Sequence, residues 1–343
     1  MRDSIQSQQA ENISPVHQLL PMMLGVAQTQ LLRVAVELGI ADRLKGEPKS
    51  LEQLADATDT QAAMLLRIMR ALIDLGIFAE TETGKLICTP LGELLQAENP
   101  NSLRNYANLM SSDWLNRVWP NLLHSVRKGE SAFEDVYGMN IYTYLQEQPD
   151  AGAVFNSAMT DVSKQEGDAL RDAYDFSAFH TVVDVGGGGG LLLATILRAN
   201  PSLEGILFEL PSVVERAHAI SETDDLRDRC RMISGDFLSA VPPGGDLYIL
   251  KRILIDHPDE RARRILTNIR DVMVPEGRVI VVDPDIRSLY GKLFDILMLM
   301  VFGSRLRTEG ELRDLFSDTG FKLTRTMDMR STLRLYEAAP ALS

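Results

Sequence analysis

The sequence predicts an α/β protein in which a doubly wound, mostly parallel sheet follows a mostly helical amino-terminal region. From His180 onward, short apolar runs typical of strands alternate with helix-like runs, which is the pattern of strand-helix-strand units. The first of these strands ends in five consecutive glycines, Gly186 to Gly190. The last two strands, 322–328 and 332–338, stand so close together that we expect an antiparallel hairpin at the sheet edge.

The amino-terminal region contains the elements of a winged helix. A capped helix is expected to start at Ser50, and Asp59 with the threonine after it is expected to cap a second helix over 61–75. Two short strands over 77–89 then form a hairpin around a glycine turn. This order predicts a winged-helix domain over residues 1–104, which either binds DNA or serves as a dimerisation module.

Composition favours the dimerisation module and limits the setting. The net charge of -13 argues against a nucleic-acid partner. The two cysteines imply no disulfide framework, and the first eleven residues lack the apolar core of a signal peptide. The most apolar stretch, 294–302, is too short to span a bilayer. We therefore expect a cytoplasmic protein with neither a membrane nor nucleic acid as partner.

The spacing of the glycines indicates which ligand the first strand serves. A dinucleotide fingerprint needs a third glycine three positions after the second, where this chain has leucine. The chain instead matches D-x-G-x-G-x-G, at Asp184, Gly186, Gly188 and Gly190. Glycines let the backbone approach a ligand where a Cβ atom would collide. This spacing is that of S-adenosylmethionine (SAM) sites, and the strand-turn-helix unit predicts a Rossmann-like sheet.

Further cofactor contacts are expected at the carboxyl ends of the next strands. Glu209 ends the second strand, where a carboxylate can accept hydrogen bonds from both ribose hydroxyls. Asp236 and Phe237 follow the third strand and can contact the adenine amine and ring face. Lys251 closes the fourth strand, from which its long side chain can reach the cofactor.

With these motifs the chain resembles the class I O-methyltransferases that carry an amino-terminal winged helix. That group includes plant caffeic-acid and hydroxyindole methyltransferases and many bacterial natural-product enzymes. The resemblance rests on VDVGGG (183–188), FELP (208–211), GDF (235–237), LK (250–251), PEGR (275–278), RT (307–308) and GF (320–321). It implies SAM as cofactor, a homodimer formed through the amino-terminal domains, and a SAM-binding domain over 105–343 with a helical substrate-pocket segment over 105–174.

The chain departs from this family at the catalytic dyad. Members that deprotonate a phenol use a histidine in a stretch like L-K-x-x-L-H-D-W-x-D, and this position is Ile255 here. Two carboxylates normally orient that histidine. One of their positions is Asp283, and the other is Leu306. An aliphatic side chain cannot accept a proton, so the usual dyad is absent.

Three explanations remain open for the missing dyad. Orientation alone can support methyl transfer to oxygen or nitrogen, because the SAM sulfonium is already a strong donor. A displaced base can take the proton, with His257, Asp256 and Asp283 as candidates. Alternatively, SAM stays bound while the enzyme performs pericyclic, decarboxylating or hydroxylation chemistry, since a sulfonium stabilises developing negative charge. We expect methyl transfer to a hydroxyl of a small aromatic or polyketide-like metabolite.

The resemblance also implies an apolar substrate pocket and no metal. Pocket positions carried over from the family are Trp114, Phe155, Met159, Met298 and Phe302. The last two lie one helical turn apart and so share a face. No group of His, Cys and Asp has the spacing of metal ligands, so we expect no metal ion.

Overall fold

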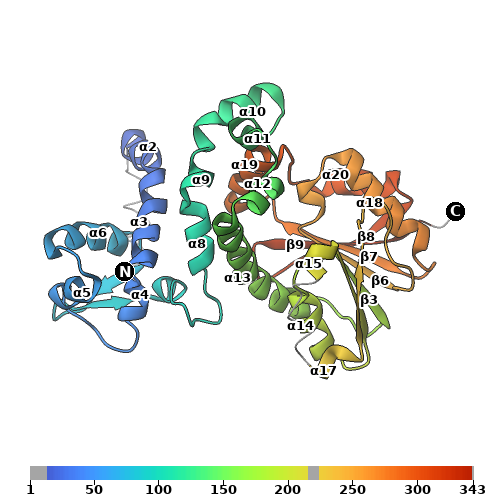
Figure 1. Cartoon of the computed structure of the whole chain (residues 1–343), viewed down its shortest axis with the longest axis horizontal. Helices are drawn as coiled ribbons and strands as arrows, with labels where there is room; N and C mark the ends of the chain where they lie inside the picture. The colour runs from blue at the N-terminus through green and yellow to red at the C-terminus, as the bar shows by residue number, and fades with distance from the viewer. Residues whose placement is uncertain (1–13, 215–223, 342–343) are drawn as a thin grey trace. The chain divides into compact units, whose positions relative to one another are not determined.

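The computed structural model describes residues 14–214 and 224–341 in two compact units (Figure 1). Unit 1 runs through Asn116 and includes Ala153–Asp161, and unit 2 comprises Arg117–Gly152 and the residues from Val162 on. The domain boundary at residue 104 stays a prediction. The sequence also predicts a helix over 213–221; its larger part lies outside the described residues, and its start falls in α15 (Pro211–Val214).

Unit 1 is helical apart from one small hairpin. Its elements are α2 (Pro15–Met23), α3 (Gly25–Glu37), α4 (Ile40–Arg43), α5 (Leu51–Thr58), α6 (Ala62–Asp74), β1 (Phe78–Glu80), β2 (Leu86–Cys88), α7 (Pro90–Glu93), α8 (Arg104–Ser111) and α9 (Asp113–Asn116). Ser50 caps α5 as predicted, in a full capping box with Gln53. Leu54, Met69 and Phe78 pack in one buried cluster, so α5, α6 and the antiparallel pair β1–β2 share a core in the expected winged-helix order.

The predicted N-cap of α6 is wrong, because the residue assigned to it ends the preceding helix. Gln61 is the N-cap residue of α6, whereas Asp59 closes α5 with a left-handed backbone at φ 51°. The Thr60 amide donates a hydrogen bond to the Ala55 carbonyl, which ends the helix behind it. Aspartate tolerates the left-handed region better than most residues do, so the same residue type serves at either end of a helix.

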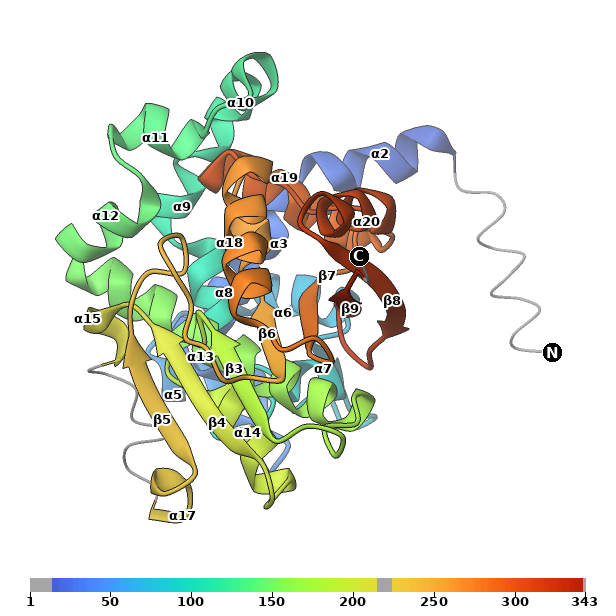
Figure 2. The same ribbon diagram turned by 90° about the vertical axis from the view of Figure 1, so that its right-hand side faces the viewer.

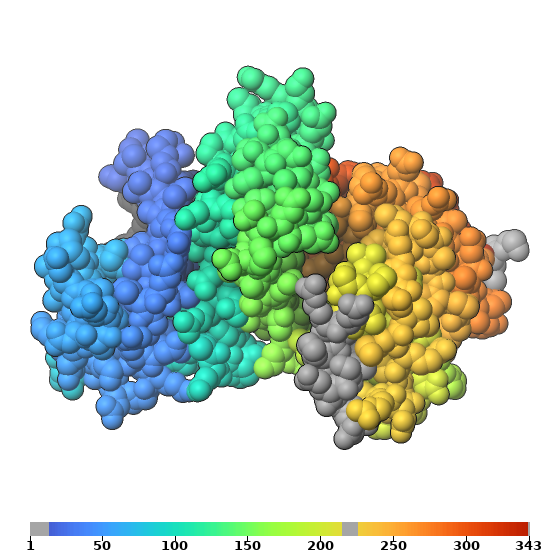
Figure 3. All heavy atoms as spheres, viewed as in Figure 1, coloured from blue at the N-terminus to red at the C-terminus, as the bar shows by residue number. Residues whose placement is uncertain are grey.

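The helix α2 and the start of α3 expose apolar side chains. Val16, Leu19, Leu20, Met22, Met23, Leu24 and Val26 are each between 52% and 74% exposed. Figure 3 shows this segment in dark blue at the surface of unit 1. Among the described residues, no single helix is long and apolar enough to cross a membrane; α2 and α3, bent by 50°, pass together on length and composition.

Unit 2 contains the sheet. Its helices are η1 (Trp119–Asn121), α10 (Leu122–Lys128), α11 (Ala132–Tyr137), α12 (Ile141–Glu147), α13 (Pro149–Ala173, shared with unit 1), α14 (Leu191–Ala199), α15, α17 (Asp224–Arg227), η2 (Leu254–Asp256), α18 (Asp259–Val272), α19 (Leu289–Phe302) and α20 (Glu309–Asp318). Its strands are β3 (Thr181–Val185), β4 (Glu204–Glu209), β5 (Cys230–Ser234), β6 (Leu247–Lys251), β7 (Arg278–Pro284), β8 (Phe321–Asp328) and β9 (Leu333–Pro340).

The seven strands confirm the predicted sheet. Their order is β5-β4-β3-β6-β7-β9-β8, and Figure 2 shows them from β5 at one edge to β8 at the other. The strands β3 to β7 pair in parallel, and β9 joins β7 antiparallel with β8 outside it. The carboxyl ends of β3, β4, β6 and β7 therefore meet at one edge of the sheet, where ligands of doubly wound folds bind.

Alternate residues of the central strands build two cores, one on each face of the sheet. Val182 and Ile249 pack with the apolar side of α14 on one face. Val183 and Leu250 pack with α18 and α20 on the other. Because side chains alternate along a strand, continuously apolar strands such as these must be covered on both faces. This double cover holds the strand ends in place.

Candidate functional site

The glycine turn after β3 adopts a backbone that only glycine takes easily. Gly186, Gly188 and Gly190 have φ angles of 70°, 57° and 78°, and Gly190 is the N-cap residue of α14. A Cβ atom on Gly186 would lie 2.4 Å from the Ile253 side chain. The three glycines named from the sequence thus form an open turn at the end of β3, and their contact with cofactor stays a prediction.

Asp184 lies beneath this turn. It is 1% exposed, and its Oδ2 atom has no hydrogen-bond partner among the described residues. A Cβ atom on Gly187 would come within 2.4 Å of that oxygen. Burial raises the pKa of Asp184 to about 7, against a lowering effect of Lys251. A buried polar atom without a partner, next to a cradle of glycines, fits a site that a polar ligand completes.

Glu209 faces the same turn from the end of β4. Its Oε2 accepts a hydrogen bond from the Gly188 amide at 3.1 Å, and its Oε1 accepts one from the Leu210 amide at 2.8 Å. The carboxylate therefore stands beside the glycine backbone with acceptor capacity left on both oxygens. This arrangement suits two neighbouring hydroxyl donors, such as those of a ribose.

The segment after β5 lies beside a hollow of about 380 Å³. Gly235 and Asp236 line it, together with Phe208 and residues 239–242. Asp236 accepts a hydrogen bond from the Leu238 amide, and the Phe237 ring lies 5.6 Å from the His257 ring, edge to face. Phe237 and His257 thus pack edge to face next to Asp236 in the chain and beside the loop of Ile255.

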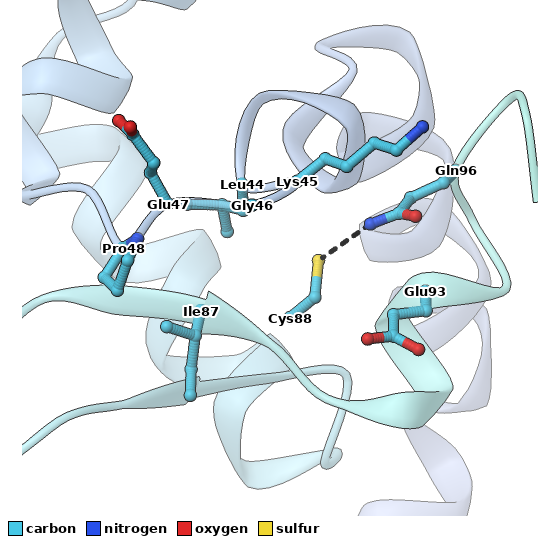
Figure 4. A pocket seen from close by; sticks show the side chains of 9 residues that line it. All are labelled: Leu44, Lys45, Gly46, Glu47, Pro48, Ile87, Cys88, Glu93 and Gln96. Atoms are coloured by element: carbon cyan, nitrogen blue, oxygen red, sulfur yellow. Dashed lines mark hydrogen bonds between the residues drawn. The ribbon is translucent and has the colours of Figure 1, made fainter.

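The described part of the chain holds a second, smaller hollow, of about 320 Å³, in unit 1 (Figure 4). It is lined by residues of 44–48, by Ile87 and Cys88, and by Glu93 and Gln96. Gln96 donates hydrogen bonds to the Ala41 carbonyl and, at 3.9 Å, to Cys88 Sγ. Burial raises the pKa of Cys88 to about 11, so its thiol stays protonated. None of the site residues named from the sequence lines this hollow.

Lys251, at the end of β6, is engaged by a buried carboxylate. Its Nζ donates to Glu166 Oε2 at 2.9 Å and lies 3.3 Å from Ser163 Oγ. The next residue, Arg252, has a left-handed φ of 58° and donates to Glu166 Oε1 at 2.8 and 2.6 Å. Desolvation opposes ionisation of Glu166, but the two cations prevail and lower its pKa. Glu166 thus ties α13 to the carboxyl end of β6.

The position of the missing dyad is aliphatic and buried. Ile255 and Leu306 are 2% and 4% exposed. The loop that carries Ile255 is held by Arg307, whose guanidinium donates to the carbonyls of Leu254 and His257 at 2.6 and 2.8 Å and to Asp259. Hydrogen bonds to two backbone carbonyls thus fix the loop around Ile255, which carries the position of the family's histidine.

Asp256 projects from this loop toward a tyrosine of α12. Tyr142 donates its hydroxyl proton to Asp256 Oδ2 at 2.8 Å, and the Tyr142 ring lies 5.8 Å from the Phe302 ring. Burial raises the pKa of Asp256 to about 6, while Tyr142 and Arg252 lower it. This carboxylate is ionised near neutral pH and still a far better proton acceptor than an exposed aspartate.

The other two candidate bases lie in different surroundings. Burial and the neighbouring cations Arg261 and Arg307 lower the pKa of His257 to about 4. Asp283, on β7, is 5% exposed, and burial raises its pKa to about 7. Of the three candidates, Asp256 is the one that Tyr142 hydrogen-bonds, and the ring of Tyr142 lies beside that of Phe302.

The predicted pocket residues fall in both units. Met298 and Phe302 lie on α19 of unit 2, and the Phe302 ring lies beside that of Tyr142. Trp114, Phe155 and Met159 belong to unit 1, with the latter two one turn apart on α13. Whether the five residues line one pocket stays a prediction. No group of three or more His, Cys, Asp or Glu side chains within 14–214 and 224–341 could hold a metal ion.

Sequence reasoning missed Tyr142, Glu166 and Arg307. Tyr142 is separated from Asp256 by 114 residues, and Glu166 from Arg252 by 86. Residues so far apart in the sequence have no local spacing that would predict their contact. Arg307 did belong to a motif of the resemblance, but nothing in that motif shows which carbonyls its guanidinium holds.

Comparisons with known proteins agree on one family. The model of the O-methyltransferase domain matches residues 119–322, and that of the O-methyltransferase dimerisation domain matches residues 20–98. The phenazine O-methyltransferase PhzM of Lysobacter antibioticus is 40% identical over 326 residues, which cover 94% of this chain and 95% of that relative.

Two further relatives bear on the chemistry. The solved structure of CalO1, a methyltransferase of calicheamicin biosynthesis in its SAH-bound form, is 32% identical with a TM-score of 0.87, over 96% of this chain and all (100%) of that one. The aclacinomycin 10-hydroxylase RdmB of Streptomyces purpurascens is 32% identical over 339 residues, which cover 95% of this chain and 91% of that relative. Similarity at this level therefore includes a named hydroxylase as well as methyltransferases.

Proposed function

Since the chain belongs to the SAM-dependent O-methyltransferase family, we propose that it methylates a hydroxyl of a small aromatic or polyketide-like secondary metabolite. The family predicted from the sequence and SAM as its cofactor are both confirmed by the comparisons. Bound SAM supplies an electrophilic methyl group on a cationic sulfur. The glycine turn, Glu209 and Asp236 are the residues that would hold it, and the partnerless oxygen of Asp184 supports a polar ligand there.

The proton of the acceptor hydroxyl is taken by Asp256. The observation that carries this assignment is the position of its carboxylate, directly after the position of the lost histidine and hydrogen-bonded by Tyr142, whose ring lies beside that of Phe302. A pKa of about 6 leaves Asp256 ionised at neutral pH and basic enough to accept a proton. His257, with a pKa near 4, is a weaker base and packs its ring against Phe237 instead.

Orientation supplies the rest of the rate. The acceptor oxygen becomes a nucleophile as its proton passes to Asp256, and holding it in line with the methyl group removes the entropy of a bimolecular encounter. The apolar side chains of α19 suit the flat face of an aromatic acceptor. This explains how methyl transfer continues although Ile255 replaces the family's histidine.

The test of the base is a pair of conservative variants. Asp256→Asn and His257→Gln are assayed with a panel of phenolic acceptors, hydroxyphenazines among them, and trideuteromethyl-SAM. We expect Asp256→Asn to lower kcat by about 100-fold, the lower range for a general base, and His257→Gln to change it less than about threefold. Full activity of Asp256→Asn would contradict the assignment, and a loss confined to His257→Gln would move the role to the histidine.

A second candidate function keeps SAM bound without methyl transfer. Two observations favour it. The positions of the family's histidine and of one of its acids carry aliphatic side chains, Ile255 and Leu306, and the chain is similar to a named 10-hydroxylase. In that case the sulfonium stabilises negative charge on the substrate, and Asp256 and Asp283 handle protons. Consumption of a substrate in the presence of SAM, without label in the product, distinguishes this function from the first.

We also propose a homodimer. The dimerisation-domain match covers residues 20–98, and the exposed apolar surface of α2 and the start of α3 offers contiguous area to a second copy. In light scattering after size exclusion, the wild type and the control Val126→Asp, at an exposed apolar site on α10, should have the mass of a dimer. Leu20→Asp with Met23→Asp should have that of a monomer. A monomeric wild type would contradict the proposal.

A further inference from the structure

Tyr142 lies where three elements of unit 2 converge. It comes from α12, its hydroxyl donates to Asp256 of η2 at 2.8 Å, and its ring lies 5.8 Å from that of Phe302 on α19. The residue is 48% exposed, so its ring contributes little to a core. A phenol at such a place is explained better by its hydroxyl than by its apolar surface.

The helix that carries Tyr142 is anchored on its own account. Asn140 caps α12 by accepting a hydrogen bond from the Thr143 amide at 3.0 Å, and Ile141 is 3% exposed. Tyr144 packs against the Phe133 ring at 5.4 Å and the Tyr137 ring at 4.6 Å. These contacts hold the backbone of α12 independently of Asp256, so the Tyr142 hydroxyl is a fixed donor to which the carboxylate adapts.

The Asp256 carboxylate depends on Tyr142 for its hydrogen bonding. Tyr142 is the only hydrogen-bonding partner that the described residues provide for the Asp256 side chain. Because the donor occupies Oδ2, the second oxygen, Oδ1, remains to accept a proton from a substrate. In the family a histidine is oriented by two acids; here an aspartate is oriented by one phenol.

Building on the proposed function, we propose that Tyr142 is a positioning residue for methyl transfer, which holds Asp256 so that Oδ1 meets the acceptor hydroxyl. The proton of the acceptor passes to Oδ1, the new bond forms between the acceptor oxygen and the methyl carbon, and the electrons of the broken bond stay on sulfur. Tyr142 keeps its own proton throughout. Desolvation and the charge of Asp256 raise the pKa of Tyr142 well above its usual value, which is consistent with a donor that does not ionise.

The charges around this pair determine the sign of the expected pH effect. The charged or titratable groups that act on Asp256 or Tyr142 are these two residues themselves, Glu209 of β4, Arg252 directly after β6 and Asp283 of β7. Among them, the Tyr142 hydroxyl and Arg252 lower the pKa of Asp256. Removal of the hydroxyl therefore raises this pKa, and the base is protonated at a higher pH.

The experiment compares Tyr142→Phe with Tyr144→Phe, which removes a phenol hydroxyl two residues along the same helix. For Tyr142→Phe we expect kcat to fall about tenfold on the alkaline plateau and the acid limb of the kcat/KM profile to move up by about half a pH unit or more. Tyr144→Phe should keep the wild-type profile. Calorimetric affinity for SAM should be unchanged in both, because the Glu209 carboxylate is held by the backbone amides of Gly188 and Leu210, which both variants leave in place.

A cycle with Asp256→Asn separates the two proposals. If Tyr142 acts through Asp256, Tyr142→Phe adds no further loss in the Asp256→Asn background. An unshifted acid limb in Tyr142→Phe, beside a strong loss in Asp256→Asn, overturns the role of Tyr142 and leaves the base in place. Wild-type activity of Asp256→Asn overturns both. If the losses in kcat of Tyr142→Phe and Asp256→Asn add in the double variant, the positioning role is also overturned. This outcome holds even if Tyr142→Phe is less stable than the wild type.

Discussion

Replacement of Glu209 by alanine tests the cofactor site most sharply. The Glu209 carboxylate faces the glycine turn, with one oxygen 3.1 Å from the Gly188 amide and the other 2.8 Å from the Leu210 amide. Hydrogen bonds to a charged group contribute about 1.5–3 kcal/mol each. Taking the lower figure for two ribose hydroxyls, because backbone amides already share the carboxylate, the loss is about 3 kcal/mol, or about 100-fold in the SAM dissociation constant.

Two further variants calibrate that magnitude. Glu209→Gln keeps one carbonyl acceptor and should weaken binding by about tenfold. Glu204→Ala removes an exposed carboxylate at the opposite end of the same strand and should leave affinity within about twofold. Isothermal titration of SAM measures all three. Wild-type affinity of Glu209→Ala would refute the assignment of this carboxylate to the cofactor, and equal losses in Glu204→Ala would show a nonspecific charge effect.

The remaining predictions concern the loop around Ile255 and the buried carboxyl group of Asp184. Arg307→Ala leaves two backbone carbonyls without their donor and should lower the free energy of unfolding, measured with denaturant, by about 2–4 kcal/mol. The control Arg305→Ala, at an arginine that is 48% exposed, should lower it by less than about 0.5 kcal/mol. Equal losses in the two variants would contradict the role of Arg307. Ile255→His should raise kcat less than about threefold, because Leu306 offers the new imidazole no acid; a large gain would show the lost dyad to be restorable. Burial raises the pKa of Asp184 to about 7, so between pH 4 and 7 its carboxyl holds a proton in the folded chain that the unfolded chain releases. Its contribution to stability should therefore fall as pH rises, by at most about 1.4 kcal/mol per pH unit. Asp184→Asn should remove this contribution and leave those of Asp256 and Asp283, whereas an unchanged slope would contradict the raised pKa of Asp184.

The glycine turn and the sheet could be predicted from the sequence because their signals are local. Each glycine of the motif occupies a left-handed position that other residues avoid, and the hairpin β8–β9 follows from two strands joined by a short turn. The cap of α6 was misassigned for a related reason. Asp59 is a good residue at either end of a helix, and its left-handed backbone became visible only in the structure.

The polar surroundings of the loop around Ile255 could not be predicted in this way. Glu166 meets Lys251 and Arg252, and Tyr142 meets Asp256, only after α12, α13 and the sheet have packed. No periodicity relates such distant residues. The absence of the histidine at Ile255 was evident from the sequence, whereas the raised pKa of Asp256 depends on burial, and its hydrogen bond depends on a donor from another helix.

The most direct test of the account is incubation of the enzyme with trideuteromethyl-SAM and a metabolite extract of the producing cells, followed by mass spectrometry. The account predicts a phenolic metabolite that gains one labelled methyl group, formed by the wild type and strongly diminished with Asp256→Asn. Comparison of the two enzymes in the same extract identifies the acceptor and tests the base together. A metabolite consumed only in the presence of SAM, but without label in its product, would contradict methyl transfer and make SAM an electrostatic element of a different reaction.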